Sequence, residues 1–201
     1  MVNIQNLDEL IQYYEDGNQI KYIFFWSHKE NSRSITKACL SQWYYSPFIN
    51  EGVTYKTSEH FMMAQKAKLF GDYEKLKEII AAKEAGYAKH LGREVANFNE
   101  EIWQKYRFDI VTHANYLKFS QQPQLKEFLL NSGNRVLVEA SPVDRVRGIG
   151  LSATSNDNMN PTKWRGLNLL GFALMRVRKI LRENKIYNLN LSFKNYFFLL
   201  S

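Results

Sequence analysis

A glutamate and a lysine stand in an apolar helical pattern in the segment YKTSEHFMMAQKAKLF, residues 55–70. Positions 59, 62, 63 and 66 follow an i, i+3, i+4, i+7 spacing, so Glu59 and Lys66 share one helix face with two methionines. Seven residues separate the two charges by roughly 10 Å along the axis. An inward-facing carboxylate and amine suit acid–base or nucleophilic chemistry. The alternative is structural, because a carboxylate in a first turn complements the helix dipole.

A loop with charges of both signs follows at 141–152, in the sequence SPVDRVRGIGLS. Asp144, Arg145 and Arg147 carry the charges, and Gly148 and Gly150 would let the backbone approach a ligand. The loop comes directly after a predicted strand, where functional loops are often found. The G-x-G spacing by itself is equally typical of a simple turn.

A third candidate is NPTKWRGLNLLG at 160–171, where a Trp-Arg-Gly loop leads into a helix. Trp164 lies in the loop, and Asn168 stands where the helix is expected to begin. Backbone N–H groups at a helix N-terminus bind anions. We therefore expect an anion site here.

The elements that must position these residues are mainly helical. Apolar periodicity and capping residues predict helices over 6–16, 57–70, 73–83, 84–91, 99–120, 122–132 and 167–184. Strands are predicted at 21–26 and 135–141, a hairpin from 42–48 and 53–57, and loops over 28–38 and 142–163. These elements predict a predominantly α-helical α+β domain over 21–184 with a small β-hairpin and short strands. A helical extension over 1–20 precedes it, and an aromatic tail over 185–201 follows.

Composition sets outer limits on the kind of protein. The chain has 201 residues, of which 45% are hydrophobic, enough for one domain with a core. A single cysteine, Cys39, excludes an intrachain disulfide framework and favours a reducing, cytoplasmic location. No secretion signal or membrane span is apparent, so no membrane partner is expected. The four histidines lack metal-ligand spacing, and no metal site is expected.

The net charge of +7 is concentrated in one segment. Residues 145–185 hold nine bases against two acids, which accounts for the whole excess. Such a segment could attract the phosphates of a nucleotide or of nucleic acid. It could equally be a solvated helix face.

Four motifs in this order, TSEHFMMAQK, LGR, SPVDRVRGIGL and WRGLNLLGFALMRVR, resemble the NADAR superfamily, also called YbiA-like. The segment LSQWYYSPF is similar to the aromatic stretch of that family. The resemblance covers residues 22–182 and implies a single YbiA-like domain. One position departs from the family, because Arg147 stands where tryptophan usually precedes the first glycine of the loop. A cation there favours a more anionic ligand.

The resemblance implies an N-glycosidase that cleaves the C–N bond between ribose C1′ and a base or amine, without a cofactor. Two substrate classes are associated with the family: phosphorylated ribosylamino-pyrimidine intermediates of riboflavin biosynthesis, and ADP-ribosylated guanine in nucleic acid. Glu59 matches the glutamate of the SEH motif, Lys66 the lysine of AQK, and Asp144 the loop acid, and these are the catalytic candidates. The substrate-binding candidates are Arg93, Arg145, Arg147 and Asn168 for phosphates, Gly148, Gly150 and Trp164 in the loops, and Trp43, Tyr44 and Phe48 for stacking or for the core.

Two other classes of function compete with the enzyme. One is a non-catalytic sensor that binds NAD or ADP-ribose in the same pocket. The other is a nucleic-acid-binding protein carried by the basic segment, whose affinity would fall steeply with salt and survive loss of Glu59. Three candidate catalytic residues together favour the enzyme. The sequence leaves the oligomeric state and the choice of substrate open.

Overall fold

The computed structural model describes residues 4–30 and 34–184. This part of the chain contains seven α-helices, two short 3-10 helices and four short strands, so the predicted α+β, mainly helical class is confirmed. In chain order the elements are α1 (Leu7–Glu15), β1 (Tyr22–Phe25), η1 (Lys37–Leu40), β2 (Phe48–Asn50), β3 (Val53–Tyr55), α2 (Ser58–Leu69), α3 (Tyr73–Ala81), α4 (Ala85–Arg93), α5 (Glu100–Gln121), α6 (Pro123–Asn131), β4 (Val136–Glu139), η2 (Pro161–Lys163) and α7 (Leu169–Arg182). The predicted tail over 185–201 lies outside the described residues.

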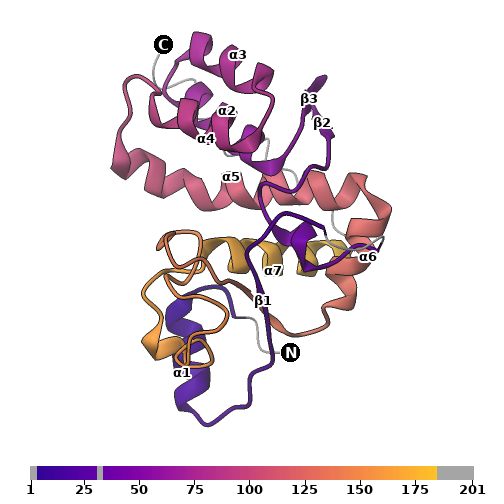
Figure 1. Cartoon of the computed structure of the whole chain (residues 1–201), viewed down its shortest axis with the longest axis vertical. Helices are drawn as coiled ribbons and strands as arrows, with labels where there is room; N and C mark the ends of the chain where they lie inside the picture. Colours follow the sequence, from indigo (N-terminus) through magenta and orange to yellow (C-terminus); the bar gives the residue numbers. More distant parts are fainter. Residues whose placement is uncertain (1–3, 31–33, 185–201) are drawn as a thin grey trace.

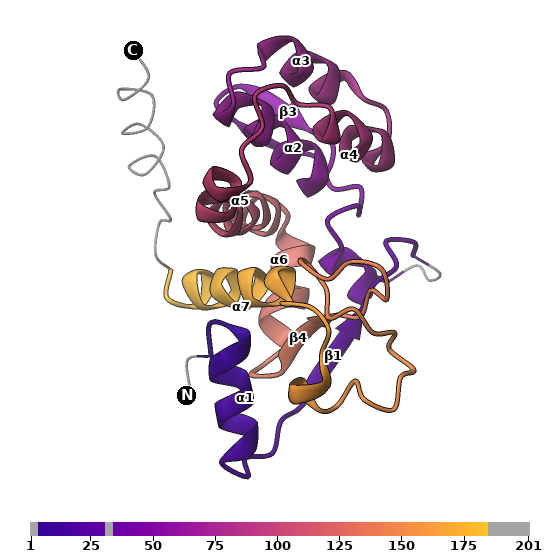
Figure 2. The same cartoon turned by 90° about the vertical axis from the view of Figure 1, so that its left-hand side faces the viewer.

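The long helix α5 separates two groups of elements (Figure 1). On one side lie α2, α3, α4 and the β2–β3 hairpin, and on the other lie α7, α1 and the pair β1–β4, an arrangement that the turned view also shows (Figure 2). Helix α5 packs against both α2 and α7. It therefore connects the helix that carries Glu59 to the helix that follows the charged loop.

The β1–β4 pair is parallel, with Tyr22 opposite Val136 and Phe25 opposite Glu139. Helix α7 lies very close to β4, because Asn168 bridges the two: its Nδ2 donates to the Leu137 carbonyl at 2.9 Å, and its Oδ1 accepts from the backbone N–H of Glu139 at 3.0 Å. Asn168 is fully buried and has a left-handed backbone with φ of 51°. This contact holds the end of β4 beside the start of α7, and so fixes both ends of the loop that connects them.

The hairpin is shifted from the prediction at its first strand. We expected that strand over 42–48, whereas β2 covers Phe48–Asn50 and pairs with β3 around a tight turn at 51–52. Pro47 has no N–H for a ladder, and its carbonyl instead accepts from the Gln122 side chain at 2.7 Å. Aromatic composition favoured a strand here, but hydrogen bonds from the Lys118 and Gln122 side chains hold the segment between η1 and β2 in turns and irregular backbone.

Helix α2 is buried on almost all sides, since nine of its twelve residues are buried. Its ordinary features are those the sequence predicts: Thr57 caps its N-terminus by accepting from the His60 N–H, and the helix ends before Gly71. His60 is structural, with its ring bonded to the Thr57 hydroxyl at 2.8 Å and to the Ala82 carbonyl at 3.1 Å. Glu59 and Lys66 lie on the buried faces of this helix, whereas Lys68 on its remaining side reaches solvent.

Candidate active site

A pocket of about 300 Å³ opens between α2, α4, α5 and the loop after β4. Five of the residues selected from the sequence line it: Glu59, Lys66, Arg93, Asp144 and Arg147. Three methionine and leucine side chains and two aromatic rings supply most of its apolar wall: Met62, Met63, Leu169, Phe98 and Trp103. Eight of the sixteen lining residues are charged, so the pocket combines an apolar wall with many convergent charges, which suits a small ligand that carries charge itself.

Glu59 lies at the inner end of this pocket and is completely buried. Its backbone N–H donates to the Gln42 carbonyl at 3.0 Å, which ties the first turn of α2 to the preceding segment. Its Oε2 atom accepts a hydrogen bond from the guanidinium of Arg147. Its Oε1 atom has no hydrogen-bond partner among the described residues. A buried oxygen without a partner is costly, so it marks a place where a ligand or water can bind.

The loop after β4 holds Arg147 in position through Asp144. The Asp144 carboxylate accepts from Arg147 Nε at 3.0 Å, and its other oxygen accepts the backbone N–H groups of Arg147 and Val146 at 2.9 and 3.1 Å. Burial by itself would raise the pKa of Asp144, but the charge of Arg147 and these hydrogen bonds outweigh burial and lower this pKa. Burial would lower the pKa of Arg147, but the carboxylates of Glu59, Glu139 and Asp144 raise it. The guanidinium therefore stays charged between two carboxylates.

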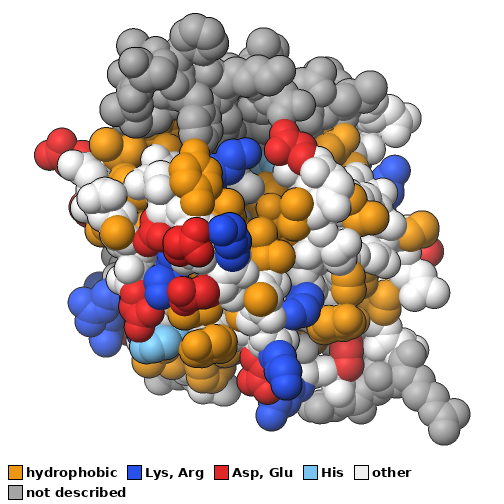
Figure 3. Space-filling model, turned by 90° about the horizontal axis from the view of Figure 1, so that it is seen from above, with side chains coloured by type: hydrophobic (Ala, Val, Ile, Leu, Met, Phe, Trp, Pro, Cys, Tyr) orange, Lys and Arg blue, Asp and Glu red, His pale blue; other side chains and the backbone are white. Residues whose placement is uncertain are grey.

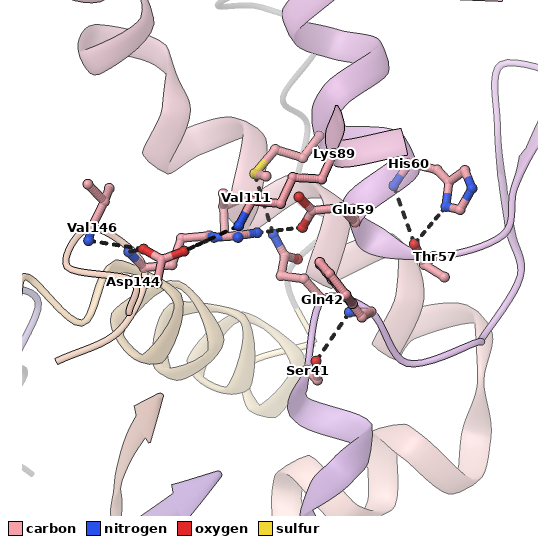
Figure 4. Close-up of polar contacts among 12 residues, drawn as sticks. Ser41, Gln42, Thr57, Glu59, His60, Lys89, Val111, Asp144 and Val146 are labelled. Carbon is pink, nitrogen blue, oxygen red and sulfur yellow. Dashed lines mark hydrogen bonds and ion pairs between the residues drawn. The ribbon is translucent and has the colours of Figure 1, made fainter. Parts of the chain in front are cut away.

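Two titratable residues at this cluster were missed by the sequence analysis. Lys89 of α4 lines the pocket with its Nζ 3.8 Å from Asp144, and burial and the charge of Arg147 lower its pKa. Figure 4 shows Lys89, Glu59 and Asp144 converging from α4, α2 and the loop. Glu139 ends β4, and burial raises its pKa to about 7 against the opposing effect of Arg147. The i, i+4 spacing of Lys89 and Arg93 was the signal that could have found Lys89.

Lys66 lies further along the same pocket. Its Nζ donates to the Gly92 carbonyl at 2.7 Å and lies 3.9 Å from the centroid of the Phe98 ring. Burial lowers the pKa of Lys66, while Glu100 opposes that shift. Lys66 and Glu59 thus line one cavity, as residues on one helix face should.

The three aromatic candidates do not line this pocket. Phe48 is buried in the core, with its ring 6.0 Å from Tyr55 and 5.9 Å from Phe61. The Tyr44 ring lies 5.3 Å from the ammonium of Lys118. Trp43 packs beside His28 at 5.7 Å. The structure gives these rings packing partners within the protein.

The remaining candidates frame the loop and lie away from the pocket lining. Trp164 is buried beside Tyr22 and donates to the Asn158 carbonyl at 2.8 Å. A Cβ at Gly148 would lie 2.7 Å from the Glu139 carbonyl, so this glycine permits close packing of the loop on β4. The other three of this group are Asn168, Gly150 with φ of 68°, and the exposed Arg145. The contacts of these residues within the protein hold in place the loop that carries Asp144 and Arg147.

Much of the basic segment bonds within the protein. Arg178 donates to the Ser132 hydroxyl and the Arg135 carbonyl at 2.7 and 2.9 Å, and Arg182 donates to the Gly133 carbonyl at 2.6 Å. These acceptors lie just beyond the end of α6, where free carbonyls need donors. Figure 3 views the molecule from above Figure 1, from the side of α3, and on that face basic and acidic side chains are interspersed. The excess charge therefore has a structural use in this part of the molecule.

Two features of the described residues concern metal ions and membranes. Residues 4–30 and 34–184 contain no group of three or more His, Cys, Asp and Glu side chains that could hold a metal ion. Within the same ranges, no helix has both the length and the apolar character needed to cross a bilayer.

Comparison with known proteins identifies the family. The NADAR domain model matches residues 24–182, so the chain belongs to the NADAR domain family and the resemblance seen in the sequence is confirmed. An N-glycosidase of Acanthamoeba polyphaga mimivirus is 45% identical over 164 residues, which are 79% of this chain and 95% of that protein. N-glycosidase YbiA of Escherichia coli is 29% identical over 139 residues, covering 69% of this chain and 78% of YbiA.

A structural comparison agrees with that assignment. The NMR structure of Escherichia coli YbiA matches with a TM-score of 0.65 and 25% identity, over 83% of this chain and 88% of that one.

A riboflavin biosynthesis protein of Vibrio vulnificus is 29% identical over 167 residues, which are 83% of this chain but only 40% of that longer protein.

Proposed function

We propose that this chain is an N-glycosidase, a hydrolase that cleaves the C–N bond between ribose C1′ and a base or amine. Family membership and the names of two relatives support this class of reaction. The observation that carries the proposal is the Oε1 atom of Glu59, which is buried, lacks a partner among the described residues and belongs to a pocket-lining side chain.

The reaction needs a carboxylate near C1′. As the C–N bond breaks, C1′ and the ring oxygen acquire oxocarbenium character, and the bond electrons leave with the nitrogen. A negative charge placed beforehand beside that carbon stabilises the transition state. Glu59 would supply it through Oε1, while Arg147 holds Oε2 and fixes the orientation. Water then adds to C1′ through its oxygen and gives up one proton, while the leaving nitrogen gains one.

The leaving nitrogen also needs a proton, and Lys89 is the best-placed donor. Lys89 lines the pocket on α4. Its pKa is lowered towards neutral pH, which makes its ammonium a better proton donor and suits a general acid. Asp144 has a lowered pKa, which suits an ionised residue that holds Arg147 and Lys89 better than it suits an acid. We assign Asp144 a positioning role within the catalytic set.

Lys66 has two candidate roles, and its lowered pKa supports the second of them. It could contact a phosphate, or its neutral amine could attack C1′ of an opened ribose to form a Schiff base with loss of water. Its present bond to the Gly92 carbonyl would have to be given up in the second case. Borohydride reduction, which would trap such an adduct covalently, separates the two roles.

The proposed substrates are phosphorylated ribosylamino-pyrimidines or ADP-ribosylated guanine in nucleic acid. Arg93 and Lys66 in the lining support an anionic group on the ligand. The Vibrio vulnificus relative is named for riboflavin biosynthesis, which supports the first class. Arg147, which stands where the family usually has tryptophan, already donates hydrogen bonds to Glu59 and Asp144. Its role is therefore to hold these two carboxylates in place more than to bind a phosphate.

The test is product release followed by mass spectrometry. Wild type, Glu59→Gln and the exposed control Glu101→Gln would each receive a ribosylamino-pyrimidine phosphate and, separately, an oligonucleotide with ADP-ribosylated guanine. Cleavage of one substrate by wild type and the control, lost in Glu59→Gln, is the expected result. No cleavage of either, with ADP-ribose still bound, would overturn the proposal in favour of a non-catalytic sensor.

A further inference from the structure

The pocket continues beyond Glu59 into a region of different chemistry. Lys66 lies two turns further along α2, roughly 10 Å from Glu59 along the axis. The side chains around it come from the end of α4, the following loop and the first turns of α5. We call this region the distal subsite and define it by Arg93, Phe98, Glu100, Trp103 and Arg107.

Helix α5 presents one face to the distal subsite. Positions 100, 103 and 107 are spaced i, i+3, i+7, and position 111 continues the same face towards Glu59. The Trp103 ring centroid lies 5.9 Å from Lys66 Nζ, and the Phe98 centroid lies 3.9 Å from it. The subsite therefore combines two aromatic rings with a row of charges.

The charges of this region are unequal in number. Arg93, Arg107 and Lys66 are cations, and Glu100 is the acid among the lining residues here. Arg107 Nη1 lies 3.7 Å from Glu100 Oε1, and the Arg107 side chain is only 16% exposed against 56% for Glu100. Because 3.7 Å exceeds hydrogen-bond length, the pair is loose, and the same Glu100 oxygen accepts a hydrogen bond from Gln104 Nε2 at 2.9 Å instead. An anion with more charge and better geometry could replace the carboxylate at this guanidinium.

We propose that the distal subsite binds the phosphate group of a phosphorylated riboside, and that Glu100 occupies Arg107 until this phosphate replaces it. The inference rests on the proposed function for the identity of the ligand. The roughly 10 Å between Glu59 and Lys66 fits a ribose at Glu59 with its 5′ substituent pointing along α2. Glu100 then competes with the phosphate for Arg107, so it lowers the affinity of the subsite for a phosphorylated ligand and leaves a ligand without an anion unaffected.

The test measures binding, so it needs no turnover. Affinity for ribose 5-phosphate and for ribose would be measured by calorimetry at fixed ionic strength in wild type, Glu100→Gln, Arg107→Gln and the double variant. Glu100→Gln should tighten ribose 5-phosphate binding about two- to fivefold, the scale of a partly exposed ion pair. Arg107→Gln should weaken it about tenfold or more, since a hydrogen bond to a charged group is lost. Ribose binding should be insensitive to both changes.

Two controls separate the proposed contact from general charge effects. Glu101→Gln removes the same charge from the neighbouring, exposed position outside the pocket lining, and should change affinity less than Glu100→Gln. In the double variant the gain from Glu100→Gln should disappear, because Glu100 acts through Arg107. Equal effects of the two glutamate changes, a gain that persists without Arg107, or no binding of ribose 5-phosphate would each overturn the subsite.

The subsite and the proposed activity fail in different ways. Glu59-dependent cleavage, with phosphate affinity indifferent to Glu100 and Arg107, would remove the subsite and leave the hydrolase. The expected changes in phosphate affinity without any cleavage would support the subsite and remove the hydrolase. Thermal unfolding of each variant checks that it is folded before its affinity is interpreted.

Discussion

Arg147 donates a hydrogen bond to Glu59 from a position 88 residues further along the chain. The same guanidinium bonds Asp144 within its own loop at 3.0 Å. Glu59 is fully buried and Arg147 is nearly so, so neither charge can rely on water when its partner is removed. Helix α2 and the loop after β4 are consequently coupled through one ion pair.

Replacing Arg147 should therefore destabilise the protein strongly. Arg147→Met keeps much of the side-chain length but leaves Glu59 buried without a counter-charge. Removing one partner of a buried pair costs about 3–5 kcal/mol. The measurement is the free energy of unfolding from urea titration at neutral pH.

Arg176→Met is the matched control for this change. Arg176 pairs with Asp109 at 3.0 Å, but both side chains are more than a third exposed. Exposed pairs are worth about 0–1 kcal/mol. Similar losses of stability in the two variants would show that burial of the Glu59–Arg147 pair has no special energetic weight.

The fold was largely predictable because its helices carry strong local signals. Helix α5 runs over Glu100–Gln121 against a predicted 99–120, and α1, α3 and α6 agree as closely. The first hairpin strand was not predictable in the same way. Residues 42–47 are rich in aromatic side chains, yet hydrogen bonds from distant Lys118 to the Ser41 carbonyl and from Gln122 to the Pro47 carbonyl fix the two ends of this segment. Local propensity gives way where tertiary bonds supply the partners.

The site was predictable where helical spacing places residues on one face. Glu59 and Lys66 share a face whichever tertiary structure forms, and both line the pocket. The contacts between elements were not predictable, because Arg147 reaches Glu59 from the loop after β4 and Lys89 reaches Asp144 from α4. For a related reason, the sequence does not distinguish an aromatic residue that stacks on a ligand from one that packs in the core. Phe48 has the same sequence pattern whether its ring contacts a ligand or Phe61.

Lys118 should make stability depend on pH. Its ammonium is fully buried and donates to the Cys39 and Ser41 carbonyls at 2.6 and 2.9 Å, and burial lowers its pKa from 10.5 to about 7. Between these values the unfolded chain binds more protons than the folded one, so stability rises with pH. Lys118→Met should remove that rise. Urea unfolding at pH 7, 8 and 9 measures it.

The upper limit of this pH range is set by Cys39. Burial raises the pKa of its thiol to about 12, which makes stability fall as pH rises above about 9. Within pH 7–9 the difference between wild type and Lys118→Met should therefore grow in favour of wild type. A difference that stays constant would mean that Lys118 titrates alike in both states.

His113 should act at acidic pH. Burial lowers the pKa of its imidazole to about 4 from 6.5, so the unfolded chain takes up the proton first and stability falls as pH drops across this range. His113→Phe should abolish that part of the loss, since the ring already stacks on Phe61 at 5.4 Å. Glu139, whose pKa is raised to about 7, acts with the opposite sign, so only the difference between variant and wild type isolates His113. Parallel stability curves from pH 7 to 4 would contradict the assignment.

Gly171 should tolerate no side chain, because helix α7 touches β4 there. A Cβ at this position would lie 2.0 Å from the Leu137 carbonyl and 2.4 Å from Asn168 Nδ2. Gly171→Ala forces the helix away from the strand and disturbs the Asn168 bridge, at a cost of about 1–3 kcal/mol or more. Urea unfolding gives the loss, and weaker cleavage would follow from displacement of the loop that carries Arg147.

Gly86→Ala is the counterpart in α4. There a Cβ meets only the Trp43 ring at 3.5 Å, an ordinary contact, so nothing has to move. Alanine in a helix is favoured over glycine by about 1 kcal/mol, and this variant should be as stable as wild type or slightly more stable. Loss of stability in Gly171→Ala alone would locate the cost at the contact between α7 and β4, whereas equal losses would assign it to the helices in general.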